Sequence, residues 1–150
     1  MKIGKVLLKG AAATSMMTIF SYIVSEQKGK NFKEPQLLAA LIRGELPKAD
    51  EKFVLPAGWA AHFGAGFSFS VFCQYIFDNT KISKTAATAM ALGTFGGLTG
   101  IEIWKISFRH NQNPPKTDFE NFYRHVFIAH LIFALSFTLL SREFADKKSS

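Results

Sequence analysis

The stretch that decides the fold is GWAAHFGAGFSFSVFCQYIF, residues 58–77. Such a run is long enough to cross a bilayer, because about 20 apolar residues of α-helix span the hydrocarbon core. It contains no Asp, Glu, Lys or Arg, and His62 is its one side chain that titrates near neutral pH. The run therefore predicts a transmembrane helix, and its histidine is a candidate functional residue.

Charged residues crowd into residues 26–52, 78–84, 105–124 and 142–148, and the segments between these regions are nearly free of charge. Each helix of a soluble domain carries charge on its wet face, so this segregation favours a membrane protein. The length of 150 residues fits one domain. The predicted fold class is all-α, a membrane four-helix bundle formed by a single integral membrane domain over residues 1–150.

Four spans and one short helix are predicted along the chain. The spans cover about residues 6–24, 54–77, 85–108 and 121–140. The short helix, about residues 35–43, falls between spans one and two and has an apolar face but too few residues to cross a bilayer. It is expected to be interfacial or to pack on the bundle.

Small residues mark two of these helices for close packing. In the first span, small and polar residues recur at steps of three and four: Gly10, Thr14, Thr18, Ser21 and Ser25. The third span carries two overlapping small-xxx-small patterns: Gly93, Gly96, Gly97 and Gly100. Small residues let helix backbones approach each other in a membrane, so both stripes predict helix–helix contacts.

Three spans bring ionisable residues to one leaflet. At about 1.5 Å per residue, His62 lies roughly 12 Å inside its span, Glu102 roughly 9 Å and His130 roughly 14 Å, measured from the same side. A charge in hydrocarbon costs roughly 2.5–3.5 kcal/mol, so such groups face the protein interior and pair. His125 is shallower, and Lys105 follows Glu102 by three residues. The candidates for a ligand site or a proton pathway are His62, Glu102, His130, His125 and Lys105.

Each candidate also has a purely structural interpretation. Glu102 can accept a hydrogen bond from a histidine, or it can form an ion pair with Lys105 near the interface. His62 can make a polar bond between helices without any chemistry, and His125 fits headgroup depth. No catalytic motif accompanies these residues, so no catalytic residue is assigned and a non-catalytic protein is expected.

Composition limits the cofactors and partners. The single Cys73 excludes an intrachain disulfide and a cysteine metal site, and no His-x-x-x-His spacing predicts a metal. No cofactor is therefore expected, although haem between His62 and His130, which lie at matching depth, is an alternative. The net charge of +7 raises nucleic-acid binding, but the basic residues are spread over loops and termini. The expected partner is the lipid bilayer and not nucleic acid.

Orientation is not decided by the positive-inside rule, because Lys and Arg divide almost evenly between the two sides of a four-span topology. The basic, acid-free start of the chain, with Lys2, Lys5 and Lys9, favours both termini in the cytoplasm. A signal peptide is an alternative interpretation of residues 1–25, but that stretch lacks a clear small-x-small cleavage site.

The order of these signals resembles the YagU-like family of small bacterial membrane proteins. The resemblance rests on Met17-Thr18, Gly58-Trp59-x-x-His62-x-x-x-Gly66, the glycine-rich third span, Pro115 and Ala129-His130. A second similarity, to VanZ-like proteins, rests on His62, Glu102 and Asp118-Phe-Glu-Asn121, although the spacing after Glu102 departs from that family. Neither resemblance implies an established reaction or a residue role. Both imply a multi-pass protein of the bacterial inner (plasma) membrane.

Three functions are compatible with the sequence. The preferred one is a non-catalytic inner-membrane protein whose His/Glu cluster stabilises the bundle or binds a small polar or lipid-headgroup ligand. The first alternative is a proton- or solute-conducting protein that uses Glu102 and the histidines, which with four short spans would have to be a homo-oligomer. The second alternative is a haem- or metal-binding membrane subunit.

Overall fold

The computed structural model describes residues 2–146, with side chains as far as residue 143. Its helices are α1 (Ile3–Lys28), α2 (Glu34–Glu45), α3 (Glu51–Asn79), α4 (Ala86–His110) and α5 (Phe119–Asp146). The described part of the chain contains no strand, so the all-α fold class is confirmed. The four long helices and the short one fall where the sequence predicts four spans and a short helix between the first two.

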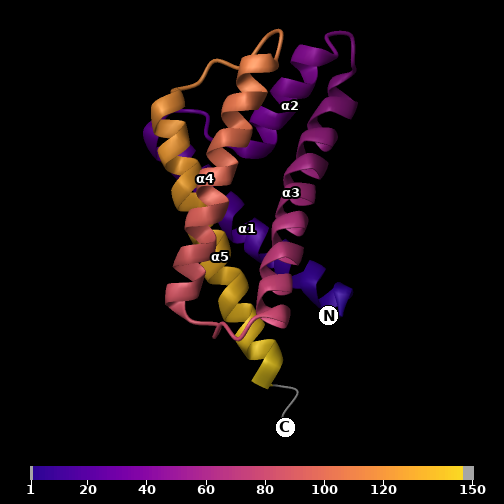
Figure 1. Ribbon diagram of the computed structural model, residues 1–150. Helices are drawn as coiled ribbons and strands as arrows, with labels where there is room; N and C mark the ends of the chain where they lie inside the picture. Colours follow the sequence, from indigo (N-terminus) through magenta and orange to yellow (C-terminus); the bar gives the residue numbers. More distant parts are fainter. Residues whose placement is uncertain (1, 147–150) are drawn as a thin grey trace.

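The long helices form a bundle, and α2 packs against one side of it. α4 packs on α5, α5 on α1 and α1 on α3, while α2 packs on α3. α3 and α4 are consecutive, yet they make only sparse contact along their length. Figure 1 shows α2 beside the upper half of α3, whereas the first turns of α1 and the last turns of α5 lie toward the lower end of the bundle.

Side-chain caps fix where three helices begin. Asp50 accepts a hydrogen bond from the backbone N–H of Lys52 at the start of α3 (2.9 Å), and Thr85 caps α4 in the same way. Asp118 precedes α5 and accepts bonds from the side chain and backbone of Asn121 (2.9 and 3.3 Å). These bonds from Asn121 lower the pKa of the Asp118 carboxyl. Capping thus sets the register of the helices that carry the histidines.

The glycine stripe of α4 packs directly on the backbone of α5. A Cβ added to Gly93 would lie 2.8 Å from the Cα of Leu131, and one added to Gly97 would lie 3.1 Å from the Cα of Phe127. Contacts this close are open only to glycine, because a real Cβ would force the helices apart. The predicted helix–helix contact of this stripe is confirmed.

The short helix α2 packs on the bundle through one glycine of α3. A Cβ at Gly58 would lie 2.7 Å from the backbone nitrogen of Ala39 and would also clash with the carbonyl oxygen of Pro35. On its other sides α2 buries Leu37 and Leu41 in an apolar cluster with residues of α4 and α5. α2 is therefore a built-in part of the fold and not a separate surface helix.

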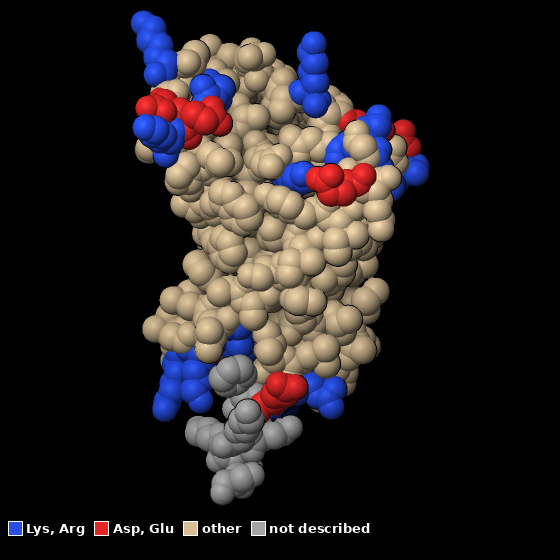
Figure 2. All heavy atoms as spheres, turned by 180° about the vertical axis from the view of Figure 1, so that it is seen from behind, with Lys and Arg blue, Asp and Glu red and all other residues tan. Residues whose placement is uncertain are grey.

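The outer surface of the bundle carries many large apolar side chains. They are exposed on α1, α4 and α5, among them Ile19, Phe95 (53% exposed) and Leu135. The buried face of α1 holds Val6 and Met17, and its other members are small or polar: Lys9, Gly10, Ala13, Thr14, Thr18, Ser21 and Ser25. Figure 2 shows the charged residues gathered at the two ends of the molecule, with a broad uncharged band between them. This distribution is the reverse of that in a soluble helical bundle.

By length and composition, two of the described helices can cross a membrane: α1 and the part of α5 from Phe119 to Glu143. α3 and α4 fall short of the same criterion. Their glycine, serine and threonine residues, and His62 and Gln74 in α3, dilute the apolar residues. Two of the four predicted spans therefore meet this criterion of length and composition.

We expect Gly58→Ala to destabilise the fold, because the new Cβ would meet the backbone of α2. Overpacking of this kind costs about 1–3 kcal/mol. Gly64→Ala is the matched control, since nothing lies within 4 Å of a Cβ at that position of the same helix. Thermal unfolding of both variants in detergent, followed by circular dichroism, measures the difference. Equal midpoints for the two variants would contradict the contact between α2 and α3.

Candidate functional site

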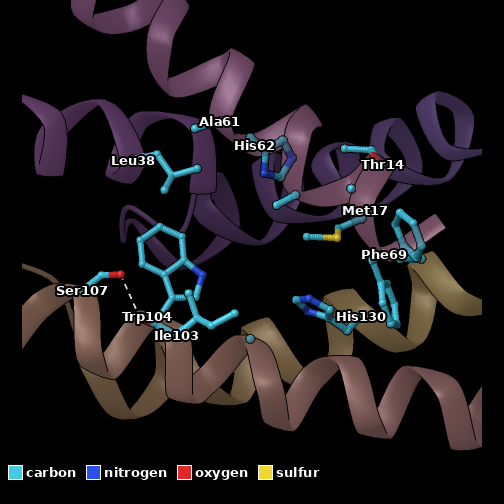
Figure 3. A pocket seen from close by; sticks show the side chains of 14 residues that line it. Thr14, Met17, Leu38, Ala61, His62, Phe69, Ile103, Trp104, Ser107 and His130 are labelled. Atoms are coloured by element: carbon cyan, nitrogen blue, oxygen red, sulfur yellow. Dashed lines mark hydrogen bonds between the residues drawn. The ribbon is translucent and has the colours of Figure 1, made fainter. Parts of the chain in front are cut away.

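A cavity of about 150 Å³ lies inside the bundle, between α1, α3, α4 and α5, with α2 at one edge. Its walls are largely apolar and are formed by Met17, Leu38, Phe69, Ile103, Trp104 and Phe133. Its polar lining comes from Thr14, His62, Ser107 and His130. Figure 3 shows His62 and His130 reaching the same space from different helices. The two deepest histidines of the sequence therefore do meet at one site.

His62 is held by α1. Its Nε2 lies 2.8 Å from the hydroxyl of Thr18, and that hydroxyl also lies 2.7 Å from the carbonyl oxygen of Thr14. A hydroxyl has a single proton, and a carbonyl oxygen can only accept. Thr18 therefore donates to Thr14, and the Nε2–H of His62 donates to Thr18. The remaining ring nitrogen, Nδ1, makes no hydrogen bond within the described residues.

His130 is held by its own helix. Its Nδ1–H donates to the carbonyl oxygen of Val126 (2.8 Å), one turn earlier in α5. The free edge of the ring faces α4 at Gly100, where an added Cβ would lie 3.1 Å from Nε2. Nε2 has no hydrogen bond within the described residues. Each cavity histidine thus has one nitrogen fixed by the protein and one nitrogen available.

The cavity has its mouth between α3 and α4, two helices whose backbones make few close contacts. Ala61 and Ala65 on α3 and Ile103 on α4 line the cavity and are also exposed on the outer surface. In the other half of the bundle this seam is filled by rings, since Phe72 of α3 stacks on Phe95 of α4 (5.2 Å between centroids). The small side chains of the two alanines leave the mouth open.

A second buried polar cluster joins α1, α2 and α5. Glu34 of α2 is only 2% exposed, and its Oε1 accepts a hydrogen bond from the hydroxyl of Ser21 (2.8 Å). His125 of α5 lies with Nε2 2.9 Å from the same hydroxyl and 3.3 Å from Glu34 Oε1. Because a carboxylate can only accept, the Nε2 of His125 carries a proton that points at this pair.

The ring of His125 is enclosed by aromatic side chains. It stacks on Phe20 of α1, with centroids 5.1 Å apart, and on Phe32 in the loop before α2, with centroids 5.4 Å apart. His125 is 4% exposed, so it lies inside the bundle and not on its surface. The Nε2–H of His125 thus points into a fully buried cluster with Ser21 and Glu34, and the two aromatic rings cover the faces of the imidazole.

The Ser–His–Glu combination is not a catalytic triad. In a triad the acid and the nucleophile occupy opposite nitrogens of the imidazole. Here Ser21 and Glu34 both lie at Nε2 of His125, and Nδ1 has no partner among the described residues. All three side chains are also fully buried. This arrangement holds helices together and does not generate a nucleophile.

Glu34 was not among the residues singled out from the sequence. A usable signal did exist, because Glu34 precedes Leu37, Leu38 and Leu41 by three, four and seven residues. That spacing puts its side chain on the apolar face of the short helix. A glutamate on the buried face of a helix requires a partner inside the protein.

A third polar contact lies near the opposite end of the bundle. Lys9 is buried, and its ammonium donates to Gln74 Oε1 (2.5 Å) and to the hydroxyl of Ser141 (2.9 Å). The same ammonium lies over the ring of Phe137, 4.9 Å from its centroid. Lys9 therefore joins α1 to both α3 and α5 through two of its three donors.

Glu102 and Lys105 lie away from the histidines. They pair with each other at 2.7 Å on the outer face of α4, where the Glu102 side chain is 64% exposed. Neither residue lines the cavity. Of the predicted site residues, His62 and His130 share the cavity, His125 belongs to the Glu34 cluster, and Glu102 and Lys105 form a surface ion pair.

Comparison with protein-family models, with curated proteins and with solved structures finds no match. The site is therefore interpreted from its own geometry. Within the described residues, no group of three or more His, Cys, Asp or Glu side chains is arranged to hold a metal ion.

We expect Glu34→Ala to lower the free energy of unfolding by about 1–3 kcal/mol, because it removes the buried acceptor that the Ser21 hydroxyl and the Nε2–H of His125 share. Glu102→Ala, which removes an exposed carboxylate, is the control and should change it by about 0.5 kcal/mol or less. Denaturant titration of both variants in mixed micelles gives the two values. A loss for Glu34→Ala no greater than that of the control would contradict the buried pair.

Proposed function

We propose that this chain is a four-span integral membrane protein of the bacterial inner membrane, with its termini in the cytoplasm and no catalytic activity. We propose further that the cavity behind His62 and His130 is a binding site for a small ligand. The observation that carries the proposal is the mouth of this cavity, which opens sideways between α3 and α4.

The inverted surface supports membrane insertion of all four long helices. α4 carries exposed Phe95, Leu98 and Ile103 although its glycines keep it below the composition criterion. In water, an apolar surface of this extent would drive aggregation, whereas in lipid it costs nothing. Gly93, Gly97 and Gly100 pack on α5, and Gly96 packs on Phe69 of α3. These glycines therefore face the interior and do not lower the apolar character of the outward face of α4.

The buried polar groups support the same conclusion. Backbone and side-chain polar groups in a bilayer must be satisfied inside the protein. Thr18 and Ser25 each donate to a carbonyl oxygen one turn earlier in α1. Thr18 also accepts from His62 on α3, and Ser21 donates to Glu34 on α2. A helix whose polar face is turned wholly inward is suited to lipid on its other faces.

The lining of the cavity favours binding over chemistry. Ser107, which supplies the α4 hydroxyl of the lining, donates a hydrogen bond to the carbonyl oxygen of Ile103 (2.8 Å). Among the described residues, no side chain that could act as a base hydrogen-bonds to this hydroxyl. Typical ligand pockets combine apolar walls with a few fixed polar groups, and the two histidines are fixed by Thr18 and Val126. The volume suits a small molecule or the end of a larger one.

The four-span topology can be tested with two cysteines in a Cys73→Ser background. We expect Asn113→Cys to react with an impermeant maleimide in intact spheroplasts and Lys81→Cys to react only after lysis. In a four-span protein the loops that carry these residues lie on opposite sides of the membrane. If only α1 and α5 crossed the bilayer, both cysteines would react from the same side, and the proposal would fail.

Proton conduction is a second candidate function, with Glu34 in the place that the sequence suggested for Glu102. Buried polar residues follow α1 from Lys9, through Thr14 and Thr18, to Ser21 and Glu34. Four buried atoms along this interior have no partner among the described residues: Thr14 Oγ1, Glu34 Oε2, His125 Nδ1 and Thr138 Oγ1. Such atoms can accept a proton or a water molecule in transit.

Proton flux into liposomes distinguishes this candidate. If the interior conducts, Glu34→Gln should reduce the flux at least about tenfold, because it removes the one buried carboxylate of the path. Glu102→Gln, on the outer face, should leave the flux unchanged. Background flux in the unaltered protein would exclude conduction, and an equal loss in both variants would exclude the path through Glu34.

The haem alternative has less support. His62 Nε2 is already bonded to Thr18 and His130 Nδ1 to Val126, and the cavity encloses about 150 Å³. A cavity of this size holds a molecule of about the size of benzene, and haem is far larger. Absorbance of the purified protein in the Soret region measures haem directly.

A further inference from the structure

The hydrogen bonds of the two cavity histidines define what they offer to a ligand. His62 uses Nε2–H on Thr18, and His130 uses Nδ1–H on Val126. A neutral imidazole has one N–H and one acceptor nitrogen. No carboxylate lines the cavity to stabilise an imidazolium, so both rings are neutral there. His62 Nδ1 and His130 Nε2 are therefore hydrogen-bond acceptors.

A donor also faces the cavity. The indole of Trp104 lies in the wall, and Figure 3 shows its nitrogen on the side of the ring toward the histidines. An indole N–H can only donate, and that of Trp104 has no partner among the described residues. A hydroxyl is the group that satisfies such a set, because it donates to a histidine and accepts from the indole.

The walls restrict the rest of the ligand. No Asp, Glu, Lys or Arg lines the cavity among the described residues, so a charged head would be left without a counter-ion. Apolar cavities of about 150 Å³ hold a molecule of the size of benzene. A hydroxyl with its first few carbon atoms fits inside, and a longer chain must leave through the mouth.

The mouth faces the outer surface of the bundle at the edge of the uncharged band. Ala61 and Ala65 rim it on the charge-free part of α3, and Ile103 rims it on α4 beside the ion pair of Glu102 and Lys105. We infer that the cavity binds the hydroxyl end of an uncharged lipid alcohol, which enters from the bilayer between α3 and α4. This inference rests on the proposed function, to which it adds the chemical class of the ligand and its route.

Quenching of tryptophan fluorescence tests the inference in detergent micelles. Trp59→Phe leaves Trp104 as the reporter, since the chain has two tryptophans. The probe is a medium-chain alcohol dibrominated near its head, compared with its methyl ether and with the matching amine and carboxylic acid. We expect saturable quenching by the alcohol, with a midpoint roughly tenfold lower than that of the methyl ether, which cannot donate.

Two pairs of variants assign the quenching to the cavity. Ala65→Leu, which fills the mouth, should abolish saturable quenching, whereas Gly64→Leu, at an exposed neighbouring position that does not line the cavity, should not. His130→Leu should remove the tenfold preference for the alcohol over the ether. Phe72→Leu, in the closed half of the seam, should keep that preference.

The outcomes separate the ligand class from the site. If alcohol and ether quench equally, or the amine or acid binds more tightly, and Ala65→Leu still abolishes quenching, the ligand class is overturned while the binding site stands. If none of the probes gives saturable quenching, or Ala65→Leu has no effect, the inference and the proposed binding site are both overturned.

Discussion

The polar face of α1 makes side-chain hydrogen bonds to three other helices. Thr18 accepts a hydrogen bond from His62 on α3. Ser21 donates a hydrogen bond to Glu34 on α2 and accepts one from His125 on α5. Lys9 donates hydrogen bonds to residues of both α3 and α5. Each of these bonds is buried, so each would cost desolvation if its partner were lost. In a bilayer there is no water to replace them. The position of α1 at the centre of the contacts follows from this constraint.

α4 is the exception, and the cavity follows from it. α1 has no side-chain hydrogen bond to α4, which is attached to the bundle through its glycine stripe on α5. Glycine packing fixes how closely two helices approach, but it supplies no polar link to α3. The seam between α3 and α4 is consequently closed by aromatic rings in one half, and in the other half it is lined by alanines. The site is located where the bundle is held least tightly.

The sequence predicted the helices well because their signals are local. Charge segregation and glycine spacing depend on neighbours within a few residues. The depth of His62 and His130 can likewise be counted along each helix from the rise per residue. The direction in which a side chain points depends on packing. Glu102 has the expected depth, yet it follows Gly100 by two residues, about 200° around the helix. Because Gly100 faces α5, Glu102 faces outward, and counting from the glycine stripe would have placed it there.

The Glu34 cluster was not predictable from depth at all. Glu34 lies outside every predicted span and reaches the interior only because α2 folds back on α3 at Gly58. Ser21 then meets Glu34 across a turn at Gly29, whose positive φ of 58° reverses the chain after α1. A contact of this kind requires the tertiary fold. The same holds for the stacking of His125 between two phenylalanines, which come from α1 and from the loop before α2.

The central claim is that the apolar outer face of this bundle is in contact with lipid, including the face of α4, whose composition alone does not indicate a span. A nitroxide label at Phe95, which is exposed in the middle of α4, tests that claim most directly. In reconstituted bilayers, the label should relax strongly with oxygen, which concentrates in hydrocarbon, and weakly with a water-soluble nickel chelate. A label that is accessible to the nickel chelate and poorly accessible to oxygen would contradict the account.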